Sequence, residues 1–211
     1  MKIAIIAAMD KEISLLRKLE TSDVFVAASG IGKVAAALKT AEIIHNHHPD
    51  LIINSGVAGG LSPSLEIGDV VCGTEVSYHD VWCGKPNLYG QVQGFPPCYQ
   101  SSSRFLPYLN ANVKKGLIVS GDRFISNPAE YAGIKKHFPD ALAVDMESAA
   151  VAQTCYIFHT PVLILRLISD TPGIKHHEQQ YSRFWETAAE KSFENLRKLL
   201  FNLSAAKISD D

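Results

Sequence analysis

The chain has 211 residues, of which 46% are hydrophobic, and its formal net charge is −2 at pH 7. This length supports one substantial hydrophobic core and is short for two ordinary domains, so we expect a single domain over residues 1–211. The nearly balanced charge argues against nucleic acid or an anionic membrane as the main partner, and it leaves a small molecule as the expected ligand.

The longest apolar runs of the sequence have the length of a strand, well below the roughly 20 residues that span a bilayer. The first run, residues 3–8, is followed by Asp10, Lys11 and Glu12 before it reaches the length of a secretory signal core. We therefore expect a cytoplasmic protein without membrane contact.

The cysteines and histidines form no strong metal-site pattern. Four cysteines are scattered without a CxxC pair, which argues against a zinc ribbon or a thioredoxin-type site. His45, His47 and His48 can bind a metal in principle, but they lie at the polar end of a predicted helix next to Pro49. We predict neither a metal ion nor a cofactor.

Strand and helix patterns alternate along the chain. Short apolar runs predict strands, and apolar residues three and four positions apart predict helices. The predicted strands cover residues 3–8, 24–28, 51–54, 69–77, 115–120, 141–144 and 161–168. The predicted helices cover residues 12–19, 34–45, 129–137, 146–156 and 181–203. This alternation predicts an α/β fold with a largely parallel sheet.

Three glycine-containing segments lie between these elements. Residues 55–60 follow the third strand, and their glycines predict a turn that brings the backbone close to a ligand. Residues 78–103 predict a long loop, which in a compact domain is usually functional or mobile. The turn at residues 30–33 lacks the full GxGxxG or GxxxxGK[ST] pattern, so it predicts no dinucleotide or triphosphate site.

Polar residues follow several of the apolar strands. Ligands of open α/β sheets bind beyond the carboxyl ends of the strands, so we expect these side chains to meet in one crevice. Carboxylates there can act as a general acid, as a general base and as acceptors for a positively charged transition state. The candidates are Asp10, Glu12, Asp122, Asp145, Glu147, Arg166, Ser169 and Asp170.

Each carboxylate also has a purely structural interpretation. Glu12 can favour the dipole of its helix, and Asp145 and Glu147 can cap the next one. Asp170 can form a turn. Arg166 is different, because an arginine inside an apolar strand needs a partner or a ligand. The residues by themselves predict an α/β enzyme with a carboxylate-rich pocket.

Seven ordered segments carry a more specific signal, at residues 7–12, 29–33, 54–60, 78–80, 120–125, 144–148 and 166–170. Together they resemble the 5'-methylthioadenosine/S-adenosylhomocysteine nucleosidases over nearly the whole chain. The resemblance implies the nucleoside phosphorylase-like fold, a three-layer sandwich with a central mixed, largely parallel sheet flanked by helices. It also implies hydrolysis of the N-glycosidic bond of an adenine thionucleoside by water, with release of adenine and without a cofactor.

The resemblance assigns roles to individual residues around that bond. Glu12 would activate the attacking water, with Arg166 helping to place both. Asp170, oriented by Ser169, would protonate nitrogen 7 of adenine, and burial at the end of an apolar strand favours the neutral acid that this step needs. Glu147 would hold the ribose hydroxyls.

The remaining residues of the expected site contact the substrate without reacting. Met146 would pack on the sugar, and the backbone of Phe124 and Ile125 would recognise adenine. The other expected substrate-binding residues are Ala58, Gly59, Asp145 and Tyr181, the last of these near the sugar or the sulfur substituent. The family forms homodimers in which a loop of the neighbour closes the pocket, and residues 82–97 are the candidate here.

Two departures from the family stand out. A β-hairpin usually lies between the first helix and Gly30, whereas here only residues 21–29 intervene, so we expect a smaller sheet. At Val57 some members have a serine whose hydroxyl helps to position the water, which valine cannot do.

Three other functions remain open at this point. A nucleoside phosphorylase would use phosphate in place of water. Phosphorylases of this superfamily present basic residues at the positions of Asp10 and Glu12, and these two carboxylates would repel phosphate. An aminodeoxyfutalosine hydrolase would use the same residues with a different 5' pocket. A non-catalytic nucleoside sensor is disfavoured by the presence of both Glu12 and Asp170.

Overall fold

The computed structural model describes the backbone of residues 1–171 and 177–206, and the side chains of these residues except 177–183 and 185–189. The strands are β1 Ile3–Ala7, β2 Val24–Ala28, β3 Leu51–Gly60, β4 Val70–Tyr78, β5 Tyr99–Gln100, β6 Lys114–Ser120, β7 Ala143–Asp145 and β8 Val162–Asp170. The helices are α1 Asp10–Leu16, α2 Lys33–His47, α3 Pro128–His137, α4 Ser148–Ile157 and α5 His177–Ala205, with short 3-10 helices at Arg17–Leu19 and Leu106–Tyr108. Among the described residues, no helix combines the length and the apolar character needed to span a membrane.

One mixed sheet joins these strands. Seven of them follow the order β2-β1-β3-β7-β6-β4-β5, and β8 pairs with both β3 and β4. The pairs β1–β2, β1–β3, β3–β8, β4–β6 and β6–β7 are parallel, and the pairs β3–β7, β4–β5 and β4–β8 are antiparallel. The predicted α/β fold with a mixed, largely parallel sheet is confirmed.

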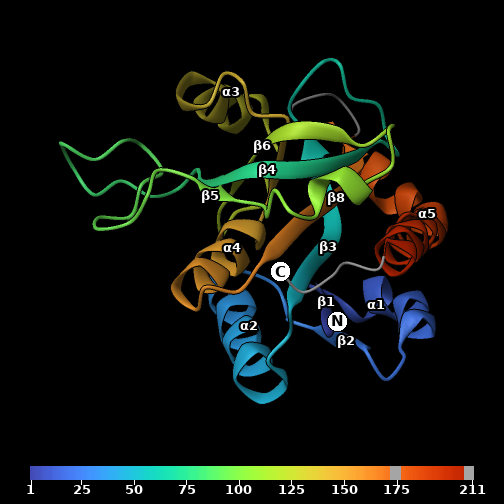
Figure 1. The fold of residues 1–211 in the computed structure, drawn as a ribbon. Helices are drawn as coiled ribbons and strands as arrows, with labels where there is room; N and C mark the ends of the chain where they lie inside the picture. The colour runs from blue at the N-terminus through green and yellow to red at the C-terminus, as the bar shows by residue number, and fades with distance from the viewer. Residues whose placement is uncertain (172–176, 207–211) are drawn as a thin grey trace.

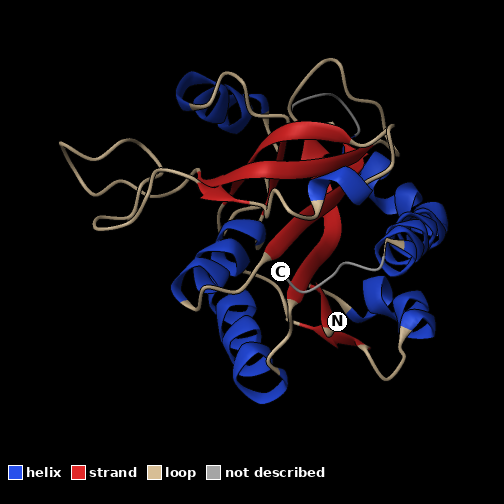
Figure 2. Ribbon diagram, viewed as in Figure 1, coloured by secondary structure: helices blue, strands red, loops and turns tan. Residues whose placement is uncertain are grey.

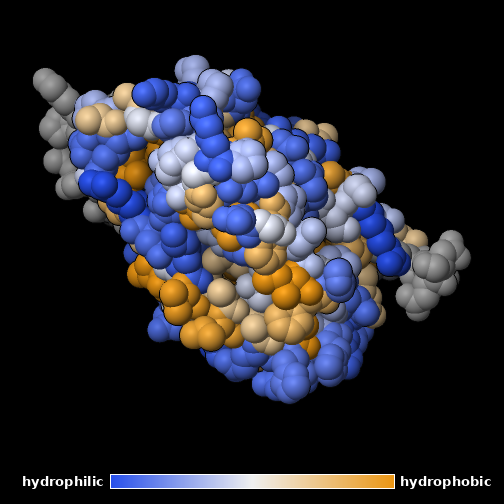
Figure 3. Space-filling model, turned by 90° about the vertical axis from the view of Figure 1, so that its left-hand side faces the viewer, coloured by the Kyte–Doolittle hydropathy of each residue, from blue (hydrophilic) through white to orange (hydrophobic). Residues whose placement is uncertain are grey.

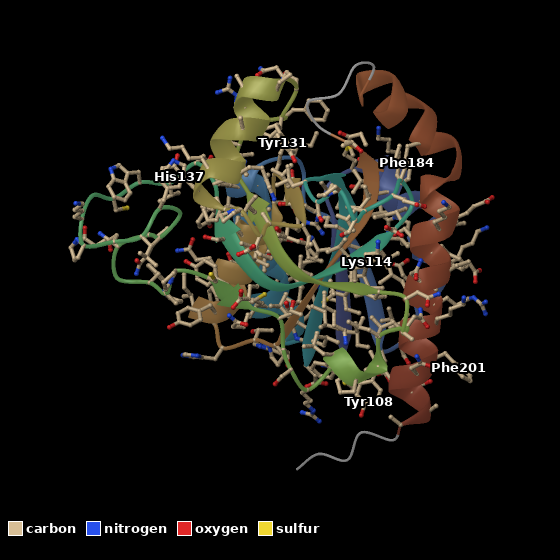
Figure 4. The ribbon with its side chains drawn as sticks, turned by 90° about the horizontal axis from the view of Figure 1, so that it is seen from above. Tyr108, Lys114, Tyr131, His137, Phe184 and Phe201 are labelled. Atoms are coloured by element: carbon tan, nitrogen blue, oxygen red, sulfur yellow. The ribbon has the colours of Figure 1, made fainter. Side chains whose placement is uncertain are left out.

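Helices cover the sheet on both faces (Figure 1, Figure 2). On one face, Leu16 of α1 and Leu199 of α5 belong to the same buried cluster as the strand residues beneath them. On the other face, Ala36 of α2 and Ala149 of α4 belong to a second buried cluster. Figure 4 shows α5 running along one whole side of the molecule. Strands that are apolar on both faces need such cover, which accounts for the three layers.

The turn predicted at residues 55–60 is wrong, because β3 continues through this segment to Gly60. It pairs with β8 along this length, with one irregularity between Ala58 and Gly59. The glycines serve close packing instead of a turn. A Cβ at Gly56 would lie 3.3 Å from Oε1 of Glu12, and a Cβ at Gly60 would lie 3.1 Å from a methyl group of Ile168.

The predicted loop 78–103 is interrupted by β5, which pairs antiparallel with the end of β4. The part between β4 and β5 projects from the body of the molecule (Figure 1). Within it, Tyr89 stacks on His137 at the end of α3, with ring centroids 3.8 Å apart. Figure 4 shows His137 beside this loop. The aromatic stack therefore attaches the projecting loop to α3.

The short segment at residues 21–29 contains β2, which forms one edge of the sheet. Two of its backbone groups are satisfied locally. The Val26 N–H donates to Oε1 of Glu20 at 3.2 Å, and the Val24 N–H donates to Oγ1 of Thr21 at 3.1 Å. The residues that precede β2 thus cover its edge.

Candidate active site

A cavity of about 290 Å³ opens where β1, β3, β7 and β8 end. Among the described side chains, four carboxylates and two arginines reach it from different parts of the chain, together with apolar side chains and the backbone of β3. Its lining consists of Ala8, Met9, Glu12, Ile31, Asn54, Ser55, Gly56, Val57, Ala58, Gly59, Arg123, Phe124, Ile125, Val144, Asp145, Met146, Glu147, Arg166, Ser169 and Asp170. The predicted crevice at the carboxyl ends of the strands corresponds to this cavity.

Glu12 lies in the first turn of α1, and only 7% of it is exposed. Its Oε2 accepts the Met9 N–H at 2.8 Å, so the carboxylate also stabilises the start of the helix. Burial raises the pKa of Glu12, and this effect outweighs the opposing hydrogen bond from Met9 and the charge of Arg166. A capping role alone does not require a buried carboxyl group facing a cavity.

Arg166, in the middle of β8, is held by a buried polar network. Its Nε donates to Oδ2 of Asp145 at 2.6 Å, and its Nη2 donates to Oδ1 of Asn54 at 2.6 Å. Asp145 accepts a second hydrogen bond from Oγ of Ser148 at 2.8 Å. Arg166 therefore has the partner that its burial demands. Sequence reasoning missed Asn54, although a polar residue directly after the apolar run of β3 was an available signal.

Glu147 lies between β7 and α4, with 9% of it exposed. Its Oε1 accepts the Gly32 N–H at 2.8 Å. Burial raises the pKa of Glu147 to about 7, and the neighbouring charge of Asp145 acts in the same direction. Of the two expected caps of α4, Asp145 accepts the Ser148 N–H, whereas Glu147 forms no capping hydrogen bond.

Asp170 ends β8 and is 3% exposed. Oγ of Ser169 lies 2.6 Å from Oδ1 of Asp170 and 3.3 Å from the carbonyl oxygen of Ala58. The hydroxyl thus links the carboxyl group to the neighbouring strand β3, which restricts its orientation.

The lining also contains apolar side chains. They include Phe124, Ile125 and Val144, and Met146 lies in the sequence between the carboxylates Asp145 and Glu147. A ligand with both an apolar and a polar part would suit this mixed lining.

Eleven of the twelve predicted site residues line this cavity: Glu12, Ala58, Gly59, Phe124, Ile125, Asp145, Met146, Glu147, Arg166, Ser169 and Asp170. The twelfth, Tyr181, lies in α5, and its side chain is outside the described part of the chain. Two other candidates lie elsewhere. Asp10 is exposed, and Asp122 accepts the Lys33 N–H at 2.7 Å.

The sequence profile of the phosphorylase superfamily matches residues 15–203. A 5'-methylthioadenosine/S-adenosylhomocysteine nucleosidase of Anoxybacillus flavithermus is 36% identical, with 97% of this chain and all of the relative covered. One from Hydrogenovibrio crunogenus is 37% identical with the same coverage. These alignments span 232 and 234 residues, more than the 211 of this chain, so the relatives contain residues that this chain lacks.

Solved structures of the same enzyme have the same fold. The nucleosidase of Neisseria meningitidis in complex with methylthio-immucillin-A gives a TM-score of 0.89 at 37% identity, covering 94% of this chain and 98% of the other. The Streptococcus pneumoniae enzyme with a transition-state inhibitor gives 0.91 at 31% identity, covering 96% and 100%. The chain therefore belongs to the 5'-methylthioadenosine/S-adenosylhomocysteine nucleosidases, which are N-glycosyl hydrolases of the phosphorylase superfamily.

Proposed function

We propose that residues 1–211 form one nucleosidase domain that uses water to hydrolyse the N-glycosidic bond of methylthioadenosine and S-adenosylhomocysteine, releasing adenine. The observation that carries this proposal is that Glu12 of α1, Glu147 of the β7–α4 junction and Asp170 of β8 meet in one cavity. The named substrates follow from the relatives' names, and relatives bind methylthio-immucillin-A and, in the Colwellia psychrerythraea enzyme, adenine.

Glu12 is the general base that takes a proton from the attacking water. A raised pKa supports this role, because a stronger base accepts the proton more readily near neutral pH. Asp145 and Asn54 hold Arg166 in place. Its charge therefore lies near Glu12, and the described contacts include no direct ion pair between these two side chains.

Glu147 holds the ribose hydroxyls, and Met146 packs on the sugar. The sugar gains positive charge as its bond to adenine breaks, and nearby carboxylates stabilise that charge. Glu147, Asp145 and Glu12 line the cavity, and Arg166 is the one buried arginine among its described lining residues, so the site carries an excess of negative charge once Glu12 and Glu147 are ionised.

Asp170 is the general acid that protonates nitrogen 7 of adenine, so that the base leaves as a neutral molecule. The contact with Ser169 supports this role, because it restricts the carboxyl group. The backbone of Phe124 and Ile125 recognises adenine, and Ala58 and Gly59 also line the site. Together, acid and base catalysis of this kind contribute roughly a hundredfold to ten-thousandfold each.

Phosphorolysis is the weaker alternative. Both arginines that line the cavity already pair with carboxylates: Arg166 with Asp145, and Arg123 with Glu130. The described part of the cavity therefore offers phosphate more repulsion than attraction. Hydrolysis of aminodeoxyfutalosine would use the same residues, so aminodeoxyfutalosine serves as the second substrate in the test.

A homodimer is part of the proposal. Figure 3 shows apolar side chains gathered on the lower part of the face that carries α2 and α4. The exposed apolar residues of these helices and their ends are Ile31, Val34, Leu38, Tyr156, Ile157 and Phe158. An exposed patch of this kind is typical of a protein interface. The projecting loop at residues 82–97 would then close the 5' side of the partner's cavity.

The test is adenine release from methylthioadenosine by the purified protein, with and without phosphate. Hydrolysis requires release that is independent of phosphate and that falls at least a hundredfold in Glu12→Gln. Asp10→Asn is the matched control, because it removes an exposed carboxylate from the same helical turn. Adenine release that requires phosphate would refute the proposed hydrolysis. Adenine release from aminodeoxyfutalosine alone would refute methylthioadenosine as the substrate.

A further inference from the structure

Three charged residues outside the cavity connect segments that are far apart in the sequence. Nζ of Lys33 lies 2.7 Å from Oδ2 of Asp80 and 3.9 Å from Oδ2 of Asp122. The same Oδ2 of Asp80 accepts the Asp122 N–H at 2.9 Å, and Oδ1 of Asp122 accepts the Lys33 N–H at 2.7 Å. Asp80 thus fastens the segment after β6 to the start of α2.

Both ends of this connection reach the substrate cavity. The Lys33 N–H bonds to Asp122, and the preceding N–H, that of Gly32, bonds to Oε1 of Glu147. Residues 123–125, which follow Asp122 directly, line the cavity on the side assigned to adenine. The first turn of α2 therefore fixes the ribose carboxylate and the adenine segment relative to each other.

Packing at Gly121 shows how closely the adenine segment lies on the end of β4. A Cβ at Gly121 would lie 2.6 Å from Nε2 of His79 and 2.7 Å from Cγ of Asp80. His79 is buried, with 8% of it exposed, so it has little room to move. Only glycine allows the backbone to rest on these two side chains, which is an observation independent of the ion pairs.

We propose that Asp80 is a positioning residue of the nucleosidase, which holds residues 121–125 against α2 and so sets where adenine lies relative to Glu147. Asp80 does not line the cavity and acts through Asp122 and Lys33. The inference rests on the proposed function, because it uses the assignment of adenine to Phe124 and Ile125.

The chain offers a closely matched control in Asp69. Its Oδ2 accepts the Glu66 N–H at 2.8 Å and lies 2.8 Å from Nζ of Lys114, and its side chain is 28% exposed, against 27% for Asp80. The two aspartate side chains therefore make the same pair of contacts at nearly the same exposure, and of the two only the side chain of Asp80 contacts residues that adjoin the cavity lining.

The experiment measures the dissociation constant of adenine by calorimetry, and kcat and KM for methylthioadenosine, in Asp80→Asn, Asp80→Ala, Asp69→Asn and Asp69→Ala. We expect adenine binding to weaken about threefold in Asp80→Asn and about tenfold in Asp80→Ala, because alanine also removes the acceptor of the Asp122 N–H. KM rises by the same factors while kcat stays within about twofold, since Asp80 contacts neither Glu12 nor Asp170. The Asp69 variants keep the wild-type constants.

The inference would be overturned if the dissociation constants of adenine were the same in the Asp80 variants as in the Asp69 variants. A fall in kcat with unchanged KM would also overturn it, since that pattern reports a loss of folded enzyme. If Asp80→Ala does not fold, Asp80→Asn carries the test, because it retains an acceptor oxygen. A wild-type protein that binds adenine but does not cleave methylthioadenosine would refute the proposed function, while the adenine constants would still decide the role of Asp80.

Discussion

The replacement of Glu147 by glutamine should stabilise the protein while it damages catalysis. The pKa of this carboxyl group is raised from 4.5 to about 7 in the folded chain. Between these values the folded state keeps a proton that the unfolded state has lost, so the free energy of unfolding falls as the pH rises through this window. At about 1.4 kcal/mol per pH unit, the loss amounts to about 3 kcal/mol above pH 7.

Glutamine cannot ionise, and its amide oxygen can still accept the Gly32 N–H. We therefore expect Glu147→Gln to gain about 3 kcal/mol over the wild type at pH 8 and nothing at pH 4.5. In a chain of this length that gain raises the melting temperature by roughly 6–12 °C. Activity should fall in the same variant, because the ribose hydroxyls would lose the ionised acceptor that we propose for them.

The assay is thermal and urea unfolding at pH 4.5, 6, 7 and 8, at one protein concentration so that any dimer contributes equally. Glu66→Gln serves as the control, since Glu66 is an exposed carboxylate away from the cavity. A stability difference between Glu147→Gln and the wild type that does not change with pH would refute the reasoning.

Three further predictions concern the same cavity. Arg166→Met leaves Asp145 buried without its ion-pair partner, so urea unfolding should show that the free energy of unfolding falls by about 3–5 kcal/mol. Adding Asp145→Asn should restore part of this loss, and an unchanged unfolding midpoint in Arg166→Met would contradict the prediction. Val57→Ser supplies a hydroxyl beside the expected water, so kcat should rise about twofold to tenfold, and a lower kcat would show that the water is held elsewhere. The kcat/KM profile should fall on the acid side as the pH drops below about 7, because protonation removes the negative charge of Glu147; a profile that stays flat down to pH 5 would exclude that group.

Much of the fold and the site was accessible from sequence patterns. Polar residues at the carboxyl ends of apolar strands predicted where Glu12 and Asp170 meet, because the parallel strands β1, β3 and β8 bring those ends to one edge. Glu147 follows β7, which runs antiparallel to β3, so this rule does not account for its position. The need of Arg166 for a partner followed from its burial alone.

The remaining features depend on tertiary neighbours that no local pattern encodes. The glycines of residues 55–60 fit a turn equally well, and only the pairing of this segment with β8 shows that they belong to a strand. The choice of Asp145 as the partner of Arg166 is also a tertiary result, since the chain supplies several carboxylates nearby. Asn54 lines the cavity and also accepts a hydrogen bond from Arg166, and its pairing with Arg166, 112 residues away in the chain, is a contact that sequence patterns do not encode.

Because the edge of β2 is covered by the residues that precede it, this side of the molecule can accept insertions or deletions in the chain. Residues 21–23 connect α1 and the following 3-10 helix to β2 with no contribution to the lining of the cavity. A hairpin inserted there would pair with the free side of β2 in place of Glu20 and Thr21, and it would extend the sheet away from the carboxylates of the cavity. Evolution and protein engineering can therefore add or remove strands at this border while the chemistry stays the same.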